Sequence, residues 1–332
     1  MRGFLKKLPV DTYMMLLIAT VVIATVLPVS GAAASLVSYL CSAAVALLFF
    51  LYGAKLKMEA IVAGISNWRL QLLVVGTTFG LFPLLGLGLT FFARSWLPEE
   101  LVIGLLFLCI LPSTVQSSIA LTAMARGNVP AAICAASVSN MLGVVLTPAF
   151  AALLLSTSGV TLGASSVIRI CVQLLLPFIA GQLMRPLIGG WIERNKLLTT
   201  VVDRGSILLI IYSAFSAGVV AGIWGRVDGA TLSLLIGLNL LLLLLVMVIV
   251  WRVGRMAGLS REDEVSLLFC GSQKSLASGV PIANILFAGT ATGLIILPLM
   301  LYHQFQLFLC AAIAQRYAAT DDLSQSLVRI KA

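Results

Sequence analysis

Leu111-Pro112-Ser113-Thr114-Val115-Gln116-Ser117-Ser118 is the first of two polar interruptions in an apolar chain, and Phe269-Cys270-Gly271-Ser272-Gln273-Lys274-Ser275 is the second. In each, hydrophobic sequence stops at Pro or Gly, gives way to amide and hydroxyl side chains, and then resumes. A membrane core offers no water to bare backbone groups, so an interruption persists only where protein or a wet cavity satisfies those groups. Paired interruptions in two halves of a chain typically mark the binding site of a transporter. The pattern therefore predicts a transporter with its site at these two breaks.

The composition supports a membrane location. The 332 residues are 61% hydrophobic and only 10% charged, and the mean hydropathy is +1.12. Apolar runs of about 20 residues predict transmembrane helices, and the absence of strand-like alternation excludes a β-barrel. The first apolar stretch, residues 13–27, lacks a convincing cleavage site and is expected to be the first span rather than a signal peptide.

Ten apolar runs are expected to cross the membrane, with boundaries uncertain by a few residues. The formal net charge of +9 does not indicate a nucleic-acid partner, because the positive residues are scattered in the short gaps between these runs. The expected spans are residues 11–29, 35–53, 70–93, 101–125, 129–155, 166–188, 205–224, 231–251, 264–288 and 291–315.

The gaps between the spans carry a strong charge asymmetry. Seventeen Lys and Arg residues fall on one side of the membrane, and only Arg94, Arg169 and Arg226 fall on the other. The positive-inside rule therefore places both termini in the cytoplasm. The regular alternation also supports ten spans, since one miscounted helix would mix the charges of every later gap.

Ten helices divide into two repeats of five. Because five is an odd number of spans, the second repeat must cross the membrane in the opposite orientation to the first. The two breaks fall in the fourth span of each half, and Pro148 and Pro298 fall in the fifth. At about 1.5 Å per residue, each break lies roughly 15 Å from the start of its span, near the middle of the membrane. The sequence therefore predicts an inverted repeat whose broken fourth and ninth helices cross at mid-membrane.

Lys274 is the one formal charge left near the middle of a span. An ammonium near the bilayer centre costs at least about 2.5–3.5 kcal/mol, so a functional role is the default expectation. It lies where the second half of the ninth span is expected to begin, and there its charge adds to the positive end of a helix dipole. Such a place attracts an anion. The structural alternatives are a lysine that reaches the membrane surface and one held by a cage of carbonyl groups.

The breaks also offer uncharged donors and acceptors. Gln116 and Gln273 mirror each other, and hydroxyl groups surround the first of them. The structural alternative is that Ser and Thr bond to their own helix four residues back. Asn140 and Asn284 either line the same cavity or join helices, and His303 either relays protons or makes one interhelical hydrogen bond. The residues expected at the substrate and ion site are Thr78, Pro112, Ser113, Thr114, Gln116, Ser117, Ser118, Asn140, Gly271, Gln273, Lys274 and Ser275, with His303 as a candidate proton relay.

Signatures of other classes are missing from the sequence. It has no phosphate-binding loop, no metal-spaced His/Cys set and no catalytic carboxylate pair, so an enzyme is not expected and no cofactor is indicated. The interiors of the predicted spans, away from their ends, contain no Asp or Glu. The six cysteines all fall in apolar segments without Cys-x-x-Cys spacing and are expected to be buried, inert thiols.

At the two breaks the sequence resembles the sodium/bile acid cotransporter family. The quoted first break, with residues 125–129 and 136–140, is similar to that family's fourth and fifth helices, and residues 271–275 are similar to its ninth-helix motif Gly-x-Gln-Asn-Ser. Gln273-Lys274-Ser275-Leu276 is closer still to the member 7-like subgroup of solute carrier family 10. The resemblance covers nearly the whole chain. It implies a bacterial inner-membrane protein with a panel domain, residues 11–53 and 166–224, and a core domain, residues 70–155 and 231–315, with the substrate between them.

The sequence departs from that family where the resemblance implies sodium ligands. Phe269 replaces a glutamate, Ala132 and Ala136 replace a serine and a threonine, and Thr78 replaces a glutamine. Sodium coupling is therefore doubtful, and Lys274 is a candidate for a fixed charge in place of the ion. Alternatively, this lysine loses and regains a proton during transport.

On these grounds the sequence predicts secondary transport of a small to medium organic anion by movement of the core against the panel. A non-transporting regulator of ion homeostasis that keeps the fold is the alternative, although intact paired breaks favour transport. Besides the anion, the expected partners are membrane lipids, and no motif indicates an oligomeric state.

Overall fold

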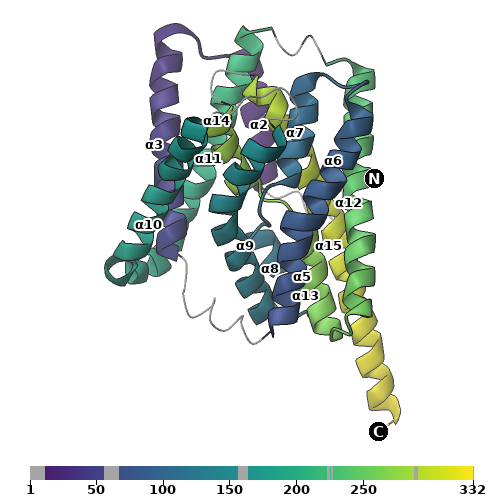
Figure 1. Ribbon diagram of the computed structural model, residues 1–332. Coiled ribbons are helices and arrows are strands. Elements are labelled where there is room, and N and C mark those ends of the chain that lie inside the picture. Colours follow the sequence, from purple (N-terminus) through teal and green to yellow (C-terminus); the bar gives the residue numbers. More distant parts are fainter. Residues whose placement is uncertain are drawn as a thin grey trace.

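The computed structural model describes residues 12–55, 67–155, 164–222, 225, 227–287 and 291–331. Every named element in these ranges is a helix (Figure 1). The all-α prediction is therefore confirmed for this part of the chain. The elements are α2 (Thr12–Val26), α3 (Gly31–Lys55), α5 (Trp68–Gly76), η2 (Thr77–Leu81), α6 (Phe82–Ala93), α7 (Glu99–Cys109), α8 (Gln116–Met124), α9 (Val129–Phe150), η3 (Ala151–Leu155), α10 (Ala164–Arg194), α11 (Lys196–Val220), α12 (Gly229–Met256), α13 (Arg261–Ser272), α14 (Leu276–Leu286) and α15 (Thr292–Lys331).

Seven helices in the described residues are long and apolar enough to cross a membrane without interruption. They comprise α3, the continuous α5–η2–α6 unit, α9 with η3, and most of α10, α11, α12 and α15. The apolar part of α2 is shorter, and the pairs α7–α8 and α13–α14 are each divided by a non-helical break. These helices make the protein a multi-pass membrane protein.

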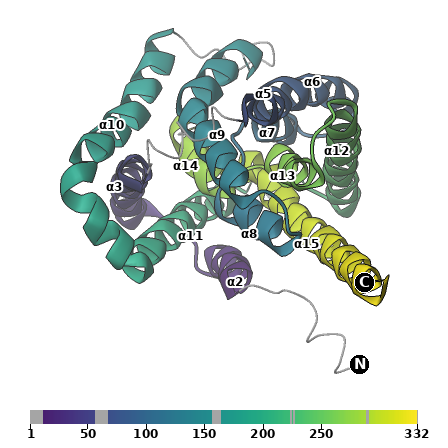
Figure 2. The same cartoon turned by 90° about the horizontal axis from the view of Figure 1, so that it is seen from below.

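The helices form two groups when the bundle is viewed along its length (Figure 2). On one side α3 packs along α10, and α2 packs against α11. On the other side lie α5, α6, α7, α12, α13 and α15, and α8, α9 and α14 lie between the groups (Figure 2). Glycine permits the closest contact, because a Cβ at Gly53 would overlap the Phe178 carbonyl of α10 and a Cβ at Gly181 would overlap the Phe50 carbonyl of α3.

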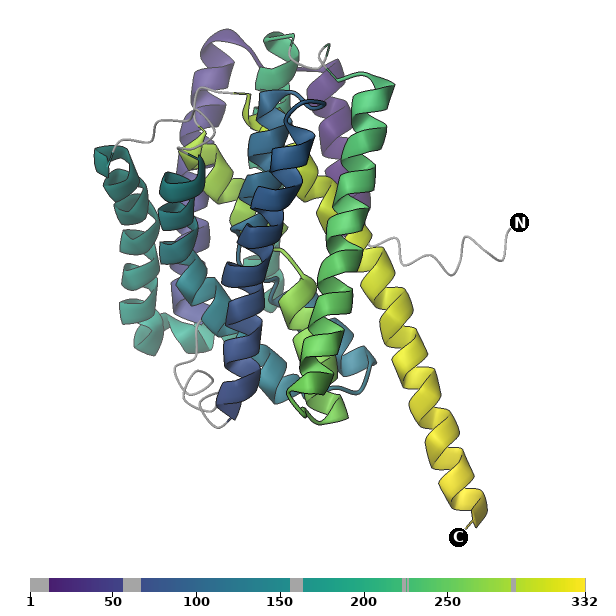
Figure 3. The ribbon, with the colours of Figure 1, turned by 45° about the vertical axis from the view of Figure 1, so that its right-hand side comes forward.

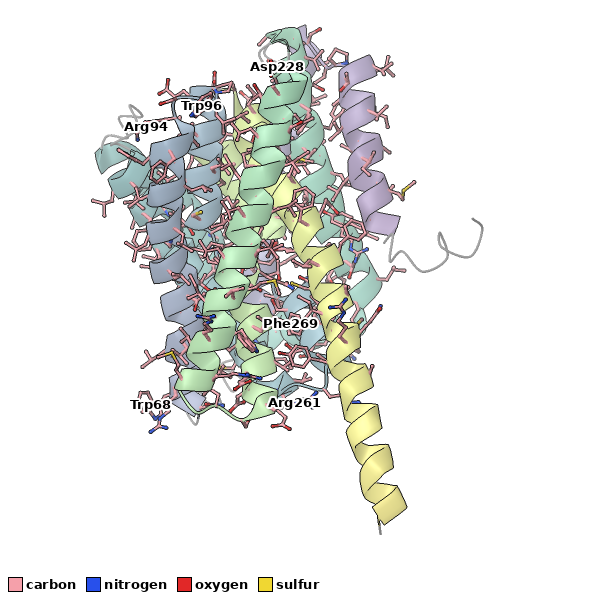
Figure 4. All side chains as sticks on the ribbon, turned by 90° about the vertical axis from the view of Figure 1, so that its right-hand side faces the viewer. Trp68, Arg94, Trp96, Asp228, Arg261 and Phe269 are labelled. Atoms are coloured by element: carbon pink, nitrogen blue, oxygen red, sulfur yellow. The ribbon has the colours of Figure 1, made fainter. Side chains whose placement is uncertain are left out.

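Aromatic and charged residues mark the two ends of the bundle. Trp68 and Arg261 lie at one end, and Arg94, Trp96 and Asp228 lie at the other (Figure 4). At the first of these ends α15 continues well beyond the other helices (Figure 3). Tryptophan and charged side chains at opposite ends are typical of helices that meet the two membrane interfaces.

Two local features of the fold were not foreseen from the sequence. The gap expected at residues 189–204 is almost entirely helical, since α10 continues to Arg194 and α11 begins at Lys196. Charged residues were read as a loop, but Lys, Arg and Glu are good helix formers, and only Asn195 separates the two helices. The expected third span also contains an unpredicted π-helical turn, η2, directly before Pro83.

Candidate functional site

The structure brings the two breaks together. The first separates α7 from α8 and the second separates α13 from α14. The Ser275 N–H donates to the Pro112 carbonyl at 2.9 Å, and the Ser113 hydroxyl donates to the Cys270 carbonyl at 2.6 Å. Non-helical backbone at this depth is thus paired with protein, as a membrane environment requires.

Each of the backbone carbonyl groups of residues 109–113 accepts a hydrogen bond from another part of the chain. One backbone N–H of the break is also paired, because the Ser113 N–H donates to the Ser139 hydroxyl at 3.0 Å. The first break is therefore satisfied by hydrogen bonds from other parts of the protein. In chain order, the donors to these carbonyls are Lys274 Nζ at 3.0 Å, Thr147 Oγ1 at 2.9 Å, Lys274 Nζ at 2.7 Å, Ser275 N at 2.9 Å and Asn140 Nδ2 at 2.8 Å.

Lys274 has a different setting from the one predicted. Its side chain is fully buried, and Nζ donates to the carbonyls of Thr78, Cys109 and Leu111 at 2.9, 3.0 and 2.7 Å. The side chain therefore turns away from the start of α14 and reaches the C-terminal end of α7, where the helix dipole is negative. With its N–H groups directed at carbonyls, the ammonium has none left for an anion. Among the alternatives raised from the sequence, the carbonyl cage describes this geometry.

Gln273 gathers the hydroxyl groups of the first break. Its Oε1 accepts hydrogen bonds from Thr114, from Ser117 at 2.6 Å and from Ser118 at 3.1 Å. Gln273, Thr114 and Ser118 are buried, whereas Ser117 is partly exposed. This cluster joins the fourth and ninth predicted spans at the level of the breaks, and it brings together four of the predicted site residues.

A glutamine outside the predicted set holds the second break. The Lys274 N–H donates to Gln306 Oε1 at 2.8 Å, and Gln306 Nε2 donates back to the Lys274 carbonyl at 3.0 Å. This pairing determines the amide orientation, so the contact at 2.9 Å from Gln306 Nε2 to His303 Nδ1 has the amide as donor. His303 is then neutral with its proton on Nε2. A relay through Nδ1 would require the amide of Gln306 to turn.

A cavity of about 430 Å³ lies between the two groups of helices. Residues of α2, α3, α10 and α11 form one wall, and both breaks with α8, α9, α14 and α15 form the other. Predicted residues that line the cavity are Pro112, Thr114, Gln116, Ser117, Asn140, Ser275 and His303. Thr78, Ser113, Ser118, Gly271, Gln273 and Lys274 are not among the lining residues.

The resemblance implied a wall from the panel domain, but the residues that form this wall were not among the predicted site residues. It includes Phe49, Lys55, Phe178 and Arg204, and the Arg204 guanidinium lies 4.9 Å from the centre of the Tyr13 ring. Arg204 was assigned to a cytoplasmic gap, so its position within a helix that borders the cavity was not foreseen. The run Tyr302-His303-Gln304-Phe305-Gln306 did carry a signal for Gln306, since residues 303 and 306 share a helix face.

Three residues stand where the resemblance implies sodium ligands, and all three are buried and apolar. Ala132, Ala136 and Phe269 are each 0% exposed. Their hydrocarbon side chains have no oxygen to offer a cation. Thr78 is buried as well, and its hydroxyl has no hydrogen-bond partner among the described residues. In the described residues, His, Cys, Asp and Glu form no group of three or more that could hold a metal ion. Cys41, Cys109, Cys134, Cys270 and Cys310 are buried free thiols, and the side chain of Cys171 lies outside the described set.

Comparison with known proteins identifies the family of the chain. Residues 11–319 match the model of the SBF-like CPA transporter family. The chain is 52% identical over 313 residues to "Uncharacterized protein PA2026" of Pseudomonas aeruginosa, with 94% of each chain covered. It is 45% identical over 316 residues to "Putative symporter YfeH" of Escherichia coli, with 95% of each covered. It is also 31% identical over 279 residues to "Sodium/bile acid cotransporter 7" of Rattus norvegicus, covering 82% of this chain and 80% of the relative. The resemblance to the sodium/bile acid cotransporters is therefore confirmed, and the chain belongs to the SBF-like CPA transporter family, whose members are membrane transporters rather than enzymes.

Proposed function

We propose that this protein is a secondary transporter that carries an amphipathic organic anion by alternating access. The observation that carries the proposal is the cavity of about 430 Å³, which has a different group of helices on each side and both breaks on one wall. Movement of one group against the other changes the side to which such a cavity opens. The moving units are the core, residues 70–155 and 231–315, and the panel, residues 11–53 and 166–224.

The lining of the cavity supports an anion with an apolar body. Phe49, Phe178 and Ile282 provide apolar surface, whereas Lys55 and Arg204 provide positive charge in the panel wall. Arginine suits carboxylate and sulfonate groups because its planar fork donates two parallel hydrogen bonds. The anionic group is thus assigned to Arg204 and Lys55, and the polar residues Thr114, Ser117 and Asn140 face the rest of the substrate. The name of the rat relative, which includes bile acid, fits this class of substrate.

The membrane arrangement is proposed as ten spans in two inverted repeats. The helices match the predicted spans when α7–α8 and α13–α14 are each counted as one broken span and α2 as a short one. Both termini are placed in the cytoplasm on the charge asymmetry of the gaps. The relatives that cover 94% and 95% of the chain are bacterial, which supports location in a bacterial inner membrane.

Transport is proposed to be independent of sodium. The buried side chains of Ala132, Ala136 and Phe269 offer no oxygen ligands, and the Lys274 ammonium already occupies the carbonyl groups of η2 and of the end of α7. The Thr114, Ser117, Ser118 and Gln273 cluster is the remaining set of side-chain oxygens on which a sodium site could be built.

Thermal-shift screening of purified protein against a library of organic anions, with sodium or choline as the counterion, tests both parts of the proposal. We expect at least one amphipathic anion to raise the unfolding temperature equally in the two salts, because a ligand that binds only the folded state stabilises it. No shift with any anion would contradict the proposed substrate class. A shift that requires sodium would contradict sodium independence alone.

A further inference from the structure

The setting of Lys274 has the composition of a cation-binding site. Three backbone carbonyl oxygens lie 2.7–3.0 Å from Nζ, and the centre of the Phe82 ring lies 4.0 Å away. Carbonyl oxygens and the face of an aromatic ring are groups that attract cations. The side chain is 0% exposed, so the ammonium lies entirely within the protein.

The chain leaves these three carbonyls free for structural reasons. In η2 the Phe82 N–H donates to Thr77 rather than to Thr78, and the next residue, Pro83, has no N–H to offer Thr78. Cys109 ends α7 and Leu111 follows it, so their carbonyls have no donor in a following helical turn. All three free acceptors converge on one point between the π-helical turn and the breaks.

The number of acceptors specifies the protonation state of the lysine in this conformation. An ammonium has three N–H donors and supplies one to each carbonyl. A neutral amine has two N–H groups and a lone pair, which would face the third carbonyl. The geometry therefore selects the charged form, and the end of α7 supplies the compensating partial negative charge. Of the two roles raised for this lysine, a fixed charge fits better than a cycling proton carrier.

We propose that Lys274 is a tethered cation that permanently fills a monovalent-cation site joining η2, the end of α7 and the second break. Truncation of the side chain leaves a carbonyl-lined hole that takes a free monovalent cation, with a small alkylammonium as the best fit. This inference deepens the proposed function, because a site filled by the protein's own ammonium explains transport without sodium.

The test compares wild type with Lys274→Ala by thermal unfolding in detergent, at constant ionic strength. Alanine removes three methylene carbons and the nitrogen, so n-propylammonium replaces the lost atoms. N-methylglucamine, which is too large for the hole, provides the reference salt, and ammonium, sodium and potassium complete the series. Lys196→Ala is the matched control, since Lys196 is an exposed lysine at the start of α11.

We expect Lys274→Ala to unfold at a lower temperature than wild type in N-methylglucamine and to recover with propylammonium in a saturable manner. Wild type and Lys196→Ala should respond equally to all five salts. If Lys274→Ala is recovered as unaggregated protein only from propylammonium buffers, the inference is supported in the same way. Equal behaviour of Lys274→Ala in every salt, in yield and in unfolding temperature, would overturn it, as would a sodium-specific stabilisation of wild type. Because the readout is stability, this result is independent of whether an organic anion is transported.

Discussion

Gln306 is the residue whose single side chain holds the extended backbone of the second break. Both halves of its amide are used, one by the N–H and one by the carbonyl of Lys274, at 2.8 and 3.0 Å. Its neighbour Gln304, by contrast, has a buried amide oxygen that has no hydrogen-bond partner in the part of the chain that the structure describes. The two glutamines therefore form a natural pair for comparison.

We expect Gln306→Leu to destabilise the protein, because each buried backbone group left unpaired costs about 1–3 kcal/mol. Gln304→Leu should be neutral or slightly stabilising, since it removes an amide oxygen that is already unpaired. Thermal unfolding of the two purified variants measures the difference. Equal unfolding temperatures would show that Gln306 does not hold the break.

Arg204 supplies the second prediction at this scale. Replacement by Met keeps much of the apolar stem and removes the guanidinium, so affinity for the anion found in the thermal-shift screen should fall about tenfold or more, in line with about 1.5–3 kcal/mol for a hydrogen bond to a charged group. Arg194→Met is the control, because Arg194 is exposed and does not line this cavity. Titration calorimetry with both variants provides the test, and unchanged affinity in Arg204→Met would move the anion site elsewhere.

The position of Lys274 at a break could be read from the sequence, but the direction of its side chain could not. That direction depends on which backbone carbonyls lack a helical hydrogen bond. The Thr78 carbonyl can accept from Lys274 only because the third predicted span adopts a π-helical turn before Pro83. A proline inside an apolar run was the available signal for that turn. The polar clusters at the breaks were more predictable, since three hydroxyl side chains of the first break meet at Gln273 in the second.

At the scale of elements, the closest helix packing is that of α3 against α10. Gly53 and Gly181 each lie against the backbone of the partner helix, so neither site has space for a Cβ. Small residues allow such contact between membrane helices, where dispersion rather than hydrophobic burial drives association. The paired glycines therefore hold two long helices of the proposed panel together.

Gly181→Ala should destabilise the protein by about 1–3 kcal/mol, as overpacking does in a tight core. Gly205→Ala is the matched variant, because Gly205 lies in α11 with no atom within 4 Å of an added Cβ. That change should instead stabilise by about 0.5–1 kcal/mol through helix propensity. An unfolding temperature below that of wild type for Gly181→Ala and above it for Gly205→Ala would agree with the structure. A shift of both unfolding temperatures in the same direction would contradict it.

Helix existence was more predictable than helix length. The apolar runs located α3, α9 and α12 well, since continuous hydrophobic sequence of membrane length has few other solutions. The ends of α10 and α11 were misplaced because charges at a membrane interface do not terminate a helix. Helical structure and membrane depth are separate properties, and hydropathy reports only the second.

At the scale of the whole molecule, the proposed topology has a direct test. Single cysteines introduced at Ser158 and Ala230 should react with an impermeant thiol reagent added outside intact cells, and one introduced at Arg126 should react only after permeabilisation. The buried native thiols should give little background labelling. Labelling of either outer position only from the cytoplasm would require a different helix count.

The central claim is that the cavity carries an organic anion through the membrane. Counterflow tests it most directly, because exchange of labelled for unlabelled anion needs no ion gradient. Proteoliposomes loaded with the anion from the thermal-shift screen should transiently accumulate the labelled form, equally in sodium and in choline, and Arg204→Met should require a higher concentration for half-maximal uptake. No accumulation above protein-free liposomes in either salt would contradict transport and favour a regulatory role for the fold.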